Sequence, residues 1–480
     1  MRKTFKIIFK ILLSLLIILS VAAALSFGYL LSKERTQGEI SWRSCYRPTF
    51  WSWFNLPPPA QLQCAAIELP LDDTQDKTVT IAMTRLPSAN ADAKDLLLLS
   101  GGPGGHSLDM IGWLSDDEYT RTLKDNFHVL GIAQRGVKPS TAIDCGGALE
   151  EDGAKAYVDA CVAHSGLDFI KSISTIHTVH DLDKIRTKLN IDSWSMLGYS
   201  YGTKIVARYA EHYPSHLRAG VLDGVVDTSE DLFTIWANQQ TGAQIAFYRF
   251  MSNCHQDTSC IFGQSDDQNR EFLTKIAKLS AQKLTDKNND PIDERAILGM
   301  IENNLGDELT WSEMYVMLDE LSHGKTSKYN ELLFIQEFGE QDFSQDAFVG
   351  INCADSAPKD RSDYLGRAKA IDKIAAYNDI EHSDDELLDA CYYWPFDGAD
   401  DLDANLISDD TPTLLFVAQA HDFATPLSNA KNMANRFGDY LIYTPYFGHT
   451  ISLSGANTCI DGAVVDYLVN GDKPDVMVCR

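Results

Sequence analysis

The chain has 480 residues, of which 44% are hydrophobic and 10% aromatic, so it can bury a sizeable core and is not an intrinsically disordered protein. This length favours two structural units over one. The 68 acidic and 41 basic residues give a formal net charge of −27, which argues against nucleic acid as a partner because it repels phosphate groups. The simplest interpretation is that this negative charge keeps the protein soluble. The alternative is an acidic pocket for a cationic group, such as a peptide amino terminus.

Residues 1–35 differ from the rest of the chain in composition. Four basic residues, Arg2, Lys3, Lys6 and Lys10, precede an uncharged and largely apolar run over Ile11–Leu31. As a helix this run spans about 30 Å, the thickness of the hydrocarbon layer, and its basic flank is expected to stay cytoplasmic. We therefore predict an anchor, the only part in the membrane, that holds the remainder on the periplasmic or extracellular face. The alternative is a signal peptide cleaved near Ala22–Ala24, which would release a secreted protein.

All ten cysteines lie beyond the apolar run. An even number of cysteines in an exported chain predicts disulfides, although spacing alone does not fix their connectivity. Our hypothesis pairs sequential neighbours: Cys45–Cys64, Cys145–Cys161, Cys254–Cys260, Cys353–Cys391 and Cys459–Cys479. No Cys-x-x-Cys pair indicates zinc or thioredoxin chemistry, and the sequence predicts no metal site and no organic cofactor.

Short β-rich runs alternate with helical patterns, which is typical of a mostly parallel sheet. The predicted strands cover residues 96–100, 127–132, 194–197, 220–222, 413–417 and 440–443. Apolar residues recur at helical spacing from Val179 to Leu189, and a second helix is expected after Ser200.

Between about residues 240 and 400 the pattern changes to long amphipathic helices, for example over Ile297–Asn304 and Trp311–Leu321. The simplest interpretation is a helical cap inserted into one α/β domain. The expected units are an anchor or signal peptide (1–35), the first part of the core (36–240), the cap (241–400) and the C-terminal part of the core (401–480).

The segment Gly198-Tyr199-Ser200-Tyr201-Gly202 matches G-x-S-x-G between a predicted strand and a predicted helix. A sharp turn at this junction forces the serine backbone into a strained conformation, and the flanking glycines remove side chains that would clash. The hydroxyl is then presented at a helix N-terminus, which also favours an oxyanion. The segment predicts Ser200 as a nucleophile.

A glycine cluster, Ser100–Gly105, follows the predicted strand that ends at Leu99. Hydrolases with a G-x-S-x-G turn take one oxyanion N–H from the residue after the nucleophile and another from a loop after an earlier strand. We therefore assign the oxyanion hole to Tyr201 and Gly102. An ordinary Gly-Pro turn is the alternative interpretation of the cluster.

Asp422 and His449 each follow a predicted strand, at the edge where α/β sheets place their active sites. The order Ser, Asp, His is that of the α/β-hydrolase fold, so we predict this fold with a mostly parallel sheet and an inserted helical cap. His449 would accept the Ser200 proton, and Asp422 would orient His449. Asp223, at the end of its own strand, is the alternative acid.

Three further histidines need an interpretation. His177 and His180 open the predicted helix before residue 189 and are more typical of a helix surface than of a metal site. His106 directly follows the glycine cluster and is a candidate for substrate contact.

Several of these segments together resemble the tripeptidyl aminopeptidase branch of the prolyl-aminopeptidase-like serine peptidases. The resemblance runs from about Cys64 to the C-terminus. It rests on Gly101–Gly105, Gly198–Gly202, Leu222–Gly224, Ile351–Asp355, Cys391–Pro395, Asp422–Pro426 and the tail from Cys459 to Cys479. After the second strand the branch usually has Asp-Gln-Arg-Gly-x-Gly-x-Ser, whereas this chain has Ala133 and Lys138 at the acid and the second glycine.

The resemblance implies an exported serine exopeptidase that removes short units, up to tripeptides, from the free amino termini of short peptides through an acyl-enzyme. It also implies a helical cap over the site, whose carboxylates bind the amino terminus in such enzymes, at positions that the sequence does not identify here. An esterase or other acyl hydrolase on the same fold is the alternative, and a non-catalytic binding protein is a third hypothesis. The sequence leaves the oligomeric state open.

Overall fold

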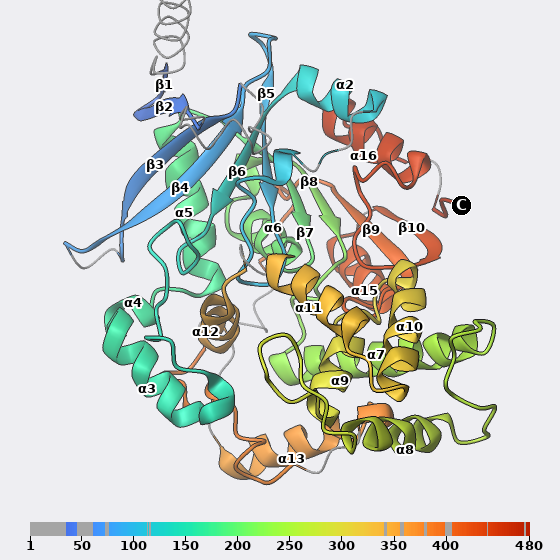
Figure 1. Cartoon of the computed structure of the whole chain (residues 1–480). Coiled ribbons are helices and arrows are strands. Elements are labelled where there is room, and N and C mark those ends of the chain that lie inside the picture. Colours follow the sequence, from blue (N-terminus) through green and yellow to red (C-terminus); the bar gives the residue numbers. More distant parts are fainter. Residues whose placement is uncertain are drawn as a thin grey trace, which may run out of the picture.

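The computed structural model describes residues 35–45, 61–72, 76–112, 114, 117–339, 343–355, 360–378, 382–398, 406–438, 440–474 and 477–480. Its centre is a ten-stranded sheet in the order β1-β2-β3-β4-β6-β5-β7-β8-β9-β10 (Figure 1). Six neighbouring strands of this sheet, β6, β5, β7, β8, β9 and β10, pair in parallel. Strands β1 to β4 pair antiparallel with one another, and β4 pairs antiparallel with β6. The strands are β1 (Arg35–Gln37), β2 (Ile40–Ser44), β3 (Gln63–Pro70), β4 (Thr78–Leu86), β5 (Lys94–Leu99), β6 (Phe127–Ala133), β7 (Trp194–Tyr199), β8 (Leu217–Asp223), β9 (Leu414–His421) and β10 (Tyr440–Phe447).

The six parallel strands lie where the sequence predicts them, and the predicted α/β-hydrolase fold with a mostly parallel central sheet is confirmed. The antiparallel half, β1 to β4, was not predicted. Its strands alternate buried and exposed residues, as in β3, where Ala65, Ile67 and Leu69 are buried between exposed neighbours. This pattern is typical of a strand with one solvated face, and it is a weaker signal than a continuous apolar run.

Helices cover both faces of the parallel strands, which explains why these strands are largely apolar. In β5, Leu96 and Leu98 belong to one hydrophobic cluster and Leu97 and Leu99 to another on the opposite face. The first cluster includes α2 (Glu118–Asn126) and α16 (Thr458–Asn470); the second includes α3 (Ala154–Ser165), α4 (Leu167–Ile170), α5 (Thr175–Lys188), α6 (Tyr201–His212) and α15 (Leu427–Phe437).

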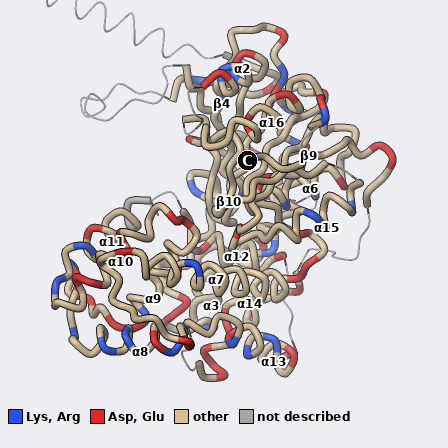
Figure 2. The backbone as a smooth tube through the Cα atoms, turned by 90° about the vertical axis from the view of Figure 1, so that its right-hand side faces the viewer, with Lys and Arg blue, Asp and Glu red and all other residues tan. Residues whose placement is uncertain are grey.

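Five of the helices described between β8 and β9 share one hydrophobic core, and they form a separate lobe beside the sheet (Figures 1 and 2). In this core the rings of Phe247 and Phe272 lie 4.9 Å apart and those of Phe250 and Trp311 lie 5.8 Å apart. The helices are α7 (Leu232–Cys254), α8 (Gln268–Ser280), α9 (Glu294–Glu302), α10 (Trp311–Ser322) and α11 (Ser327–Gly339).

The lobe docks on the sheet through Phe423, which follows β9. A Cβ atom at Gly306 would lie 2.0 Å from the Phe423 ring, and one at Gly242 of α7 would lie 2.3 Å from the Phe423 carbonyl oxygen. These two positions therefore accept only glycine without rearrangement, and the lobe closes directly on the loop after β9.

The rest of the inserted segment returns to the core of the sheet. Ile351 of α12 (Gln345–Asp355) and Ala390 of α14 (Ala390–Tyr393) are buried in the same cluster as α5 and α6. Between them, α13 (Arg361–Ile371) contacts α7. The inserted segment thus supplies both a lobe and part of the sheet's own covering layer.

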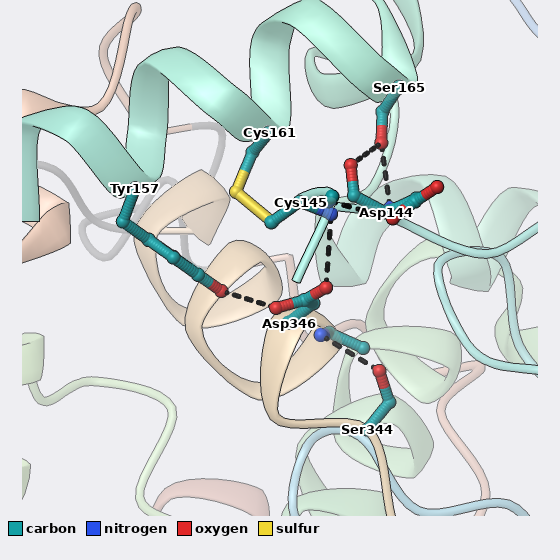
Figure 3. Close-up of a disulfide and its surroundings, with 9 residues drawn as sticks. Asp144, Cys145, Tyr157, Cys161, Ser165, Ser344 and Asp346 are labelled. Atoms are coloured by element: carbon teal, nitrogen blue, oxygen red, sulfur yellow. Dashed lines mark hydrogen bonds between the residues drawn. A yellow bond between two sulfur atoms is a disulfide. The ribbon is translucent and has the colours of Figure 1, made fainter. Parts of the chain in front are cut away.

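The structure contains five disulfides, and they are the pairs of sequential neighbours given by our hypothesis. Figure 3 shows one of them, Cys145–Cys161. Beside it Asp346, on the first turn of α12, accepts hydrogen bonds from the Cys145 backbone N–H at 3.1 Å and from the Tyr157 hydroxyl at 2.9 Å. Asp346 therefore holds the start of α12 against α3 and against the loop that the disulfide joins to α3.

Over the described ranges, we find no helix with the length and apolar character needed to cross a bilayer. The predicted anchor over Ile11–Leu31 lies outside those ranges.

Replacing Cys353 and Cys391 by alanine is expected to lower thermal stability clearly, because this disulfide closes a separation of 38 residues between α12 and α14. The loop-closure model gives a loss of about 4 kcal/mol for that separation. The matched control removes Cys254 and Cys260, which are only 6 residues apart, and should cost about 2 kcal/mol. Circular dichroism melting of both variants measures the difference, and equal melting temperatures would contradict it.

Candidate active site

Ser200 occupies the sharp turn between β7 and α6. Its backbone has φ 54° and ψ −122°, a strained conformation for a residue with a side chain. The Ser200 N–H donates to the Asp223 carbonyl oxygen at 2.9 Å, and the Thr203 hydroxyl donates to the Ser200 carbonyl oxygen at 2.6 Å. The turn is thus held at both ends, and it presents Ser200 at the carboxyl edge of the parallel strands.

The glycines around Ser200 are required by close backbone contacts. A Cβ atom at Gly198 would lie 2.4 Å from the Gly202 carbonyl oxygen, and one at Gly202 would lie 2.5 Å from that of Leu99. One at Gly101 would lie 2.9 Å from the Ser200 Cβ atom. The glycine pattern in the sequence therefore reflects the convergence of β5, β7 and α6 at the serine.

The glycine loop after β5 lies against both Ser200 and the segment before α12. Gly102, with φ 113°, lines a cavity together with Ser200 and Tyr201. The Ser344 N–H donates to the Gly104 carbonyl oxygen at 3.0 Å, and a Cβ atom at Gly104 would lie 2.6 Å from the Ser344 carbonyl oxygen. The glycine loop is therefore held between Ser200 and Ser344. Gly102 and Tyr201, the two predicted oxyanion donors, line the same cavity.

Asp422 and His449 lie in the loops that follow β9 and β10. The Nδ1 atom of His449 lies 2.8 Å from Oδ2 of Asp422. Asp422 also accepts hydrogen bonds from the N–H groups of Ala424 and Thr425, both at 2.9 Å, and from the Thr425 hydroxyl at 2.8 Å. These donors fix the carboxylate in the orientation that bonds His449.

The pKa of His449 is raised. Burial by itself would lower it, but the charge of Asp422 and the hydrogen bond that His449 donates to Asp422 outweigh burial, and the charge of Asp223 adds to them. A histidine with a raised pKa is a stronger base in its neutral form, which suits the removal of a proton from a serine hydroxyl.

Asp223 holds the loop after His449 rather than the ring itself. Its Oδ2 atom accepts hydrogen bonds from the N–H groups of Ile451 at 2.8 Å and Ser452 at 2.6 Å. Asp461 does the same for Leu453, at 2.6 Å. Burial raises the pKa of both carboxyls, that of Asp461 to about 6. The structure thus favours Asp422 over the alternative Asp223 as the partner of His449.

Ser200 and His449 line one cavity together, so the structure brings together all five predicted residues: Ser200, Asp422, His449, Gly102 and Tyr201. His106 is elsewhere: it lines a cavity with Phe343 and Asp346, and its Nδ1 atom lies 3.6 Å from Asp109.

His177 and His180 each contact a hydroxyl group outside the candidate site. His177 Nδ1 is 2.7 Å from the Ser174 hydroxyl, and burial lowers the pKa of His177 to about 4. His180 Nδ1 is 2.7 Å from the Tyr213 hydroxyl. Among the residues described, no group of His, Cys, Asp and Glu side chains is arranged to hold a metal ion.

Two charged residues near Ser200 were not predicted. Glu230 lines the cavity of Ser200 and Tyr201; its Oε1 atom accepts a hydrogen bond from Asn238 at 2.9 Å, and its Oε2 atom is buried with no hydrogen-bond partner among the described residues. Burial, together with the charges of Asp227 and Asp231, raises the pKa of Glu230 to about 7. Its only signal in the sequence is the acidic cluster just after the strand that ends at Asp223.

The second is Lys204, whose ammonium group lies 2.8 Å from Asp355 of α12. It lines the same cavity as Glu230. The signal in the sequence is its spacing: Lys204 lies four residues after Ser200 on the predicted helix, and residues four apart lie on the same face of a helix.

A strained serine on the β7–α6 turn of a parallel sheet, with a histidine and an aspartate on the loops after later strands, defines an α/β-hydrolase of the serine hydrolase class. Comparison with known proteins shows which branch of this class the chain resembles. The family described as TAP-like protein matches residues 379–479, the segment that carries Asp422 and His449.

Three relatives cover most of the chain. YuaR of Escherichia coli (strain K12) is 29% identical over 92% of this chain and 93% of its own length. The serine protease Hip1 of Mycobacterium tuberculosis (strain H37Rv) is 27% identical over 87% of this chain and 86% of its own. The tripeptidyl aminopeptidase of Streptomyces lividans is 23% identical over 91% of this chain and 86% of its own. The chain is a hydrolytic enzyme similar to the TAP-like branch of the α/β-hydrolases, in agreement with the resemblance in its sequence.

Asp422→Asn is expected to slow the reaction of Ser200 with a fluorophosphonate on the order of 10⁴-fold, because the amide stabilises the wrong tautomer of His449. The rate with the unchanged enzyme should fall as the pH drops through the raised pKa of His449, since only the neutral ring accepts a proton. The rate of labelling across pH, followed by mass spectrometry of the Ser200 peptide, measures both effects. Asp223→Asn is the control, and a larger loss there than in Asp422→Asn would reverse the two assignments.

Proposed function

We propose that this protein is an exported serine exopeptidase that releases short units from the free amino termini of peptides, with Ser200, His449 and Asp422 as its catalytic triad. The Ser200 hydroxyl oxygen attacks the scissile carbonyl carbon while His449 takes the hydroxyl proton. The resulting oxyanion is stabilised by the N–H groups of Gly102 and Tyr201. His449 then gives its proton to the leaving amine, and an acyl-enzyme on Ser200 remains.

Water completes the cycle by the same route. His449 removes a proton from water as the water oxygen attacks the acyl carbon, and it returns the proton to Ser200 as the ester bond breaks. Asp422 stabilises the imidazolium form of His449 in both halves of the reaction and keeps its own charge throughout.

The observation that carries the exopeptidase proposal is the position of Glu230. Its carboxylate lines the cavity of Ser200, and the buried Oε2 atom has no hydrogen-bond partner in the described structure. A buried carboxylate oxygen without a donor is costly, and an ammonium group would satisfy it. The free amino terminus of a peptide brings such a group, and the separation of Glu230 from Ser200 would then limit how many residues lie between the amino terminus and the scissile bond.

Three further findings support the proposal. Two relatives are named as a serine protease and as a tripeptidyl aminopeptidase. Five disulfides are typical of a protein outside the cytoplasm. The basic and apolar N-terminal sequence suits an anchor that holds the enzyme on the outer face of the cytoplasmic membrane.

The direct test offers the enzyme and its Ser200→Ala variant a series of anilides with one, two or three residues, each with a free or an acetylated amine, and a set of short acyl esters. We expect cleavage of the free-amine anilides, its loss on acetylation, and none with Ser200→Ala. The longest unit released sets the class of exopeptidase. Cleavage of esters alone would replace the proposal by the esterase alternative, and activity that survives in Ser200→Ala would show that the triad is wrong.

Glu230→Gln is expected to lower kcat/KM for free-amine anilides about 10- to 100-fold near pH 7.5, because a hydrogen-bonded charge pair is lost. In the unchanged enzyme, kcat/KM should fall as the pH drops through the pKa of Glu230, which is about 7, and through the raised pKa of His449. The slope of log kcat/KM against pH should thus exceed 1 in the range where both groups titrate, and it should not exceed 1 in Glu230→Gln, where only His449 titrates.

Stopped-flow measurement of kcat/KM from pH 5 to 9 tests this expectation. An acyl ester without an amino group serves as the control, since Glu230→Gln should leave its hydrolysis unchanged. An equal loss with both substrates would mean that Glu230 acts on the fold of the site and not on the amino terminus.

A further inference from the structure

A second cavity meets Ser200 from the side of His449. Its apolar wall consists of Met110, Leu114, Tyr199, Ile451 and Leu453. It has a volume of about 390 Å³, and among the described residues that line it there is no Lys, Arg, Asp or Glu. We call it the His449-side cavity. The cavity of Glu230, Lys204 and Asp355 is different in character, because three charged side chains line it.

The two cavities share Ser200 and Gly102, so the scissile carbonyl, which must contact both residues, belongs at their junction. His449 lines only one of the two. A leaving amine has to lie within hydrogen-bond reach of the histidine that protonates it. The amine therefore departs into the His449-side cavity, and the acyl part of the substrate occupies the cavity of Glu230.

We propose that the His449-side cavity binds the first residue of the leaving peptide and selects an apolar side chain there. This inference rests on the proposed exopeptidase function, and it adds a specificity on the leaving side of the cut. A charged side chain at this position would lose its water and find no partner of opposite charge in the wall, whereas an apolar one gains by leaving water.

The wall is built to keep its shape. The backbone of Ile451 is bonded to Asp223, and that of Leu453 to Asp461. The Tyr199 hydroxyl donates to the Ser452 carbonyl oxygen at 3.0 Å. A cavity held in this way discriminates by fit, because it does not adapt at low cost to a different side chain.

The test measures which amines the acyl-enzyme accepts. A tripeptidyl methyl ester with a free amine acylates Ser200, and the amides of leucine, phenylalanine, glycine, aspartate and lysine compete with water for the acyl group. In each transfer the amine nitrogen attacks the acyl carbon, His449 takes its proton, and Ser200 is regenerated. The ratio of transfer product to hydrolysis product reports binding in the leaving-group site alone, since the acyl part is constant.

We expect leucine and phenylalanine amides to give a transfer ratio at least about 10-fold above glycine and aspartate amides, a size usual for apolar pockets. Leu114→Asp should remove this preference and raise transfer to lysine amide, while hydrolysis of the methyl ester persists. Because a buried charge can disturb the fold, Met110→Ala provides a second, milder variant that should weaken the preference for phenylalanine amide. Leu309→Asp, at a position 88% exposed on the helical lobe, is the matched control and should change nothing.

Equal transfer to all five amides, or a preference for leucine amide that both wall variants leave intact, would overturn the inference. Failure of the proposed function looks different: no free-amine aminoacyl, dipeptidyl or tripeptidyl ester would acylate Ser200. If simple acyl esters then acylate Ser200 instead, the same amine series, run on that acyl-enzyme, still decides whether the wall selects apolar partners.

Discussion

The close approach of three backbone segments at Ser200 is the constraint on which the rest of the site depends. The end of β5, the turn after β7 and the first turn of α6 come so near one another that side chains at Gly101, Gly198 and Gly202 would overlap their neighbours. This contact forces the serine into its strained conformation and brings the glycine loop beside it. The hydroxyl and the two backbone N–H groups that we propose as oxyanion donors then occupy fixed relative positions before any substrate binds, which is the condition for electrostatic stabilisation of an oxyanion.

The histidine depends on buried carboxylates in the same way. Asp422 orients the ring, and Asp223 and Asp461 bind the backbone of the loop that follows it. A loop at a sheet edge has few partners for its N–H groups, and these carboxylates supply them. Three acidic residues from three different elements thus keep one loop in place. Their role as acceptors for this loop is the reason why several carboxylates are buried close to the active site.

The inserted helices complete the site rather than merely cover it. The lobe closes on Phe423, next to Asp422, while α12 reaches back to the sheet and places Ser344 against the glycine loop and Asp355 against Lys204. The disulfide between Cys145 and Cys161 and the bonds of Asp346 hold the start of α12 (Figure 3). One side of Ser200 consequently has a charged cavity and the other an apolar one. In the reaction we propose, this asymmetry gives a substrate its direction in the site.

The sequence by itself determined the elements whose signals are local. Largely apolar runs mark the six parallel strands because helices cover both faces of this part of the sheet. The G-x-S-x-G turn marks Ser200 because only glycine fits at positions 198 and 202. The positions of Asp422 and His449 followed from the order of residues and from strand ends. Strands β1 to β4 escaped prediction because a half-exposed strand carries only a weak alternation. The tertiary structure alone decided the rest: which acid faces His449, that Glu230 and Lys204 enter the site, and that two unlike cavities meet at Ser200. Each of these depends on contacts between residues far apart in the chain, and no local pattern of residues encodes such contacts.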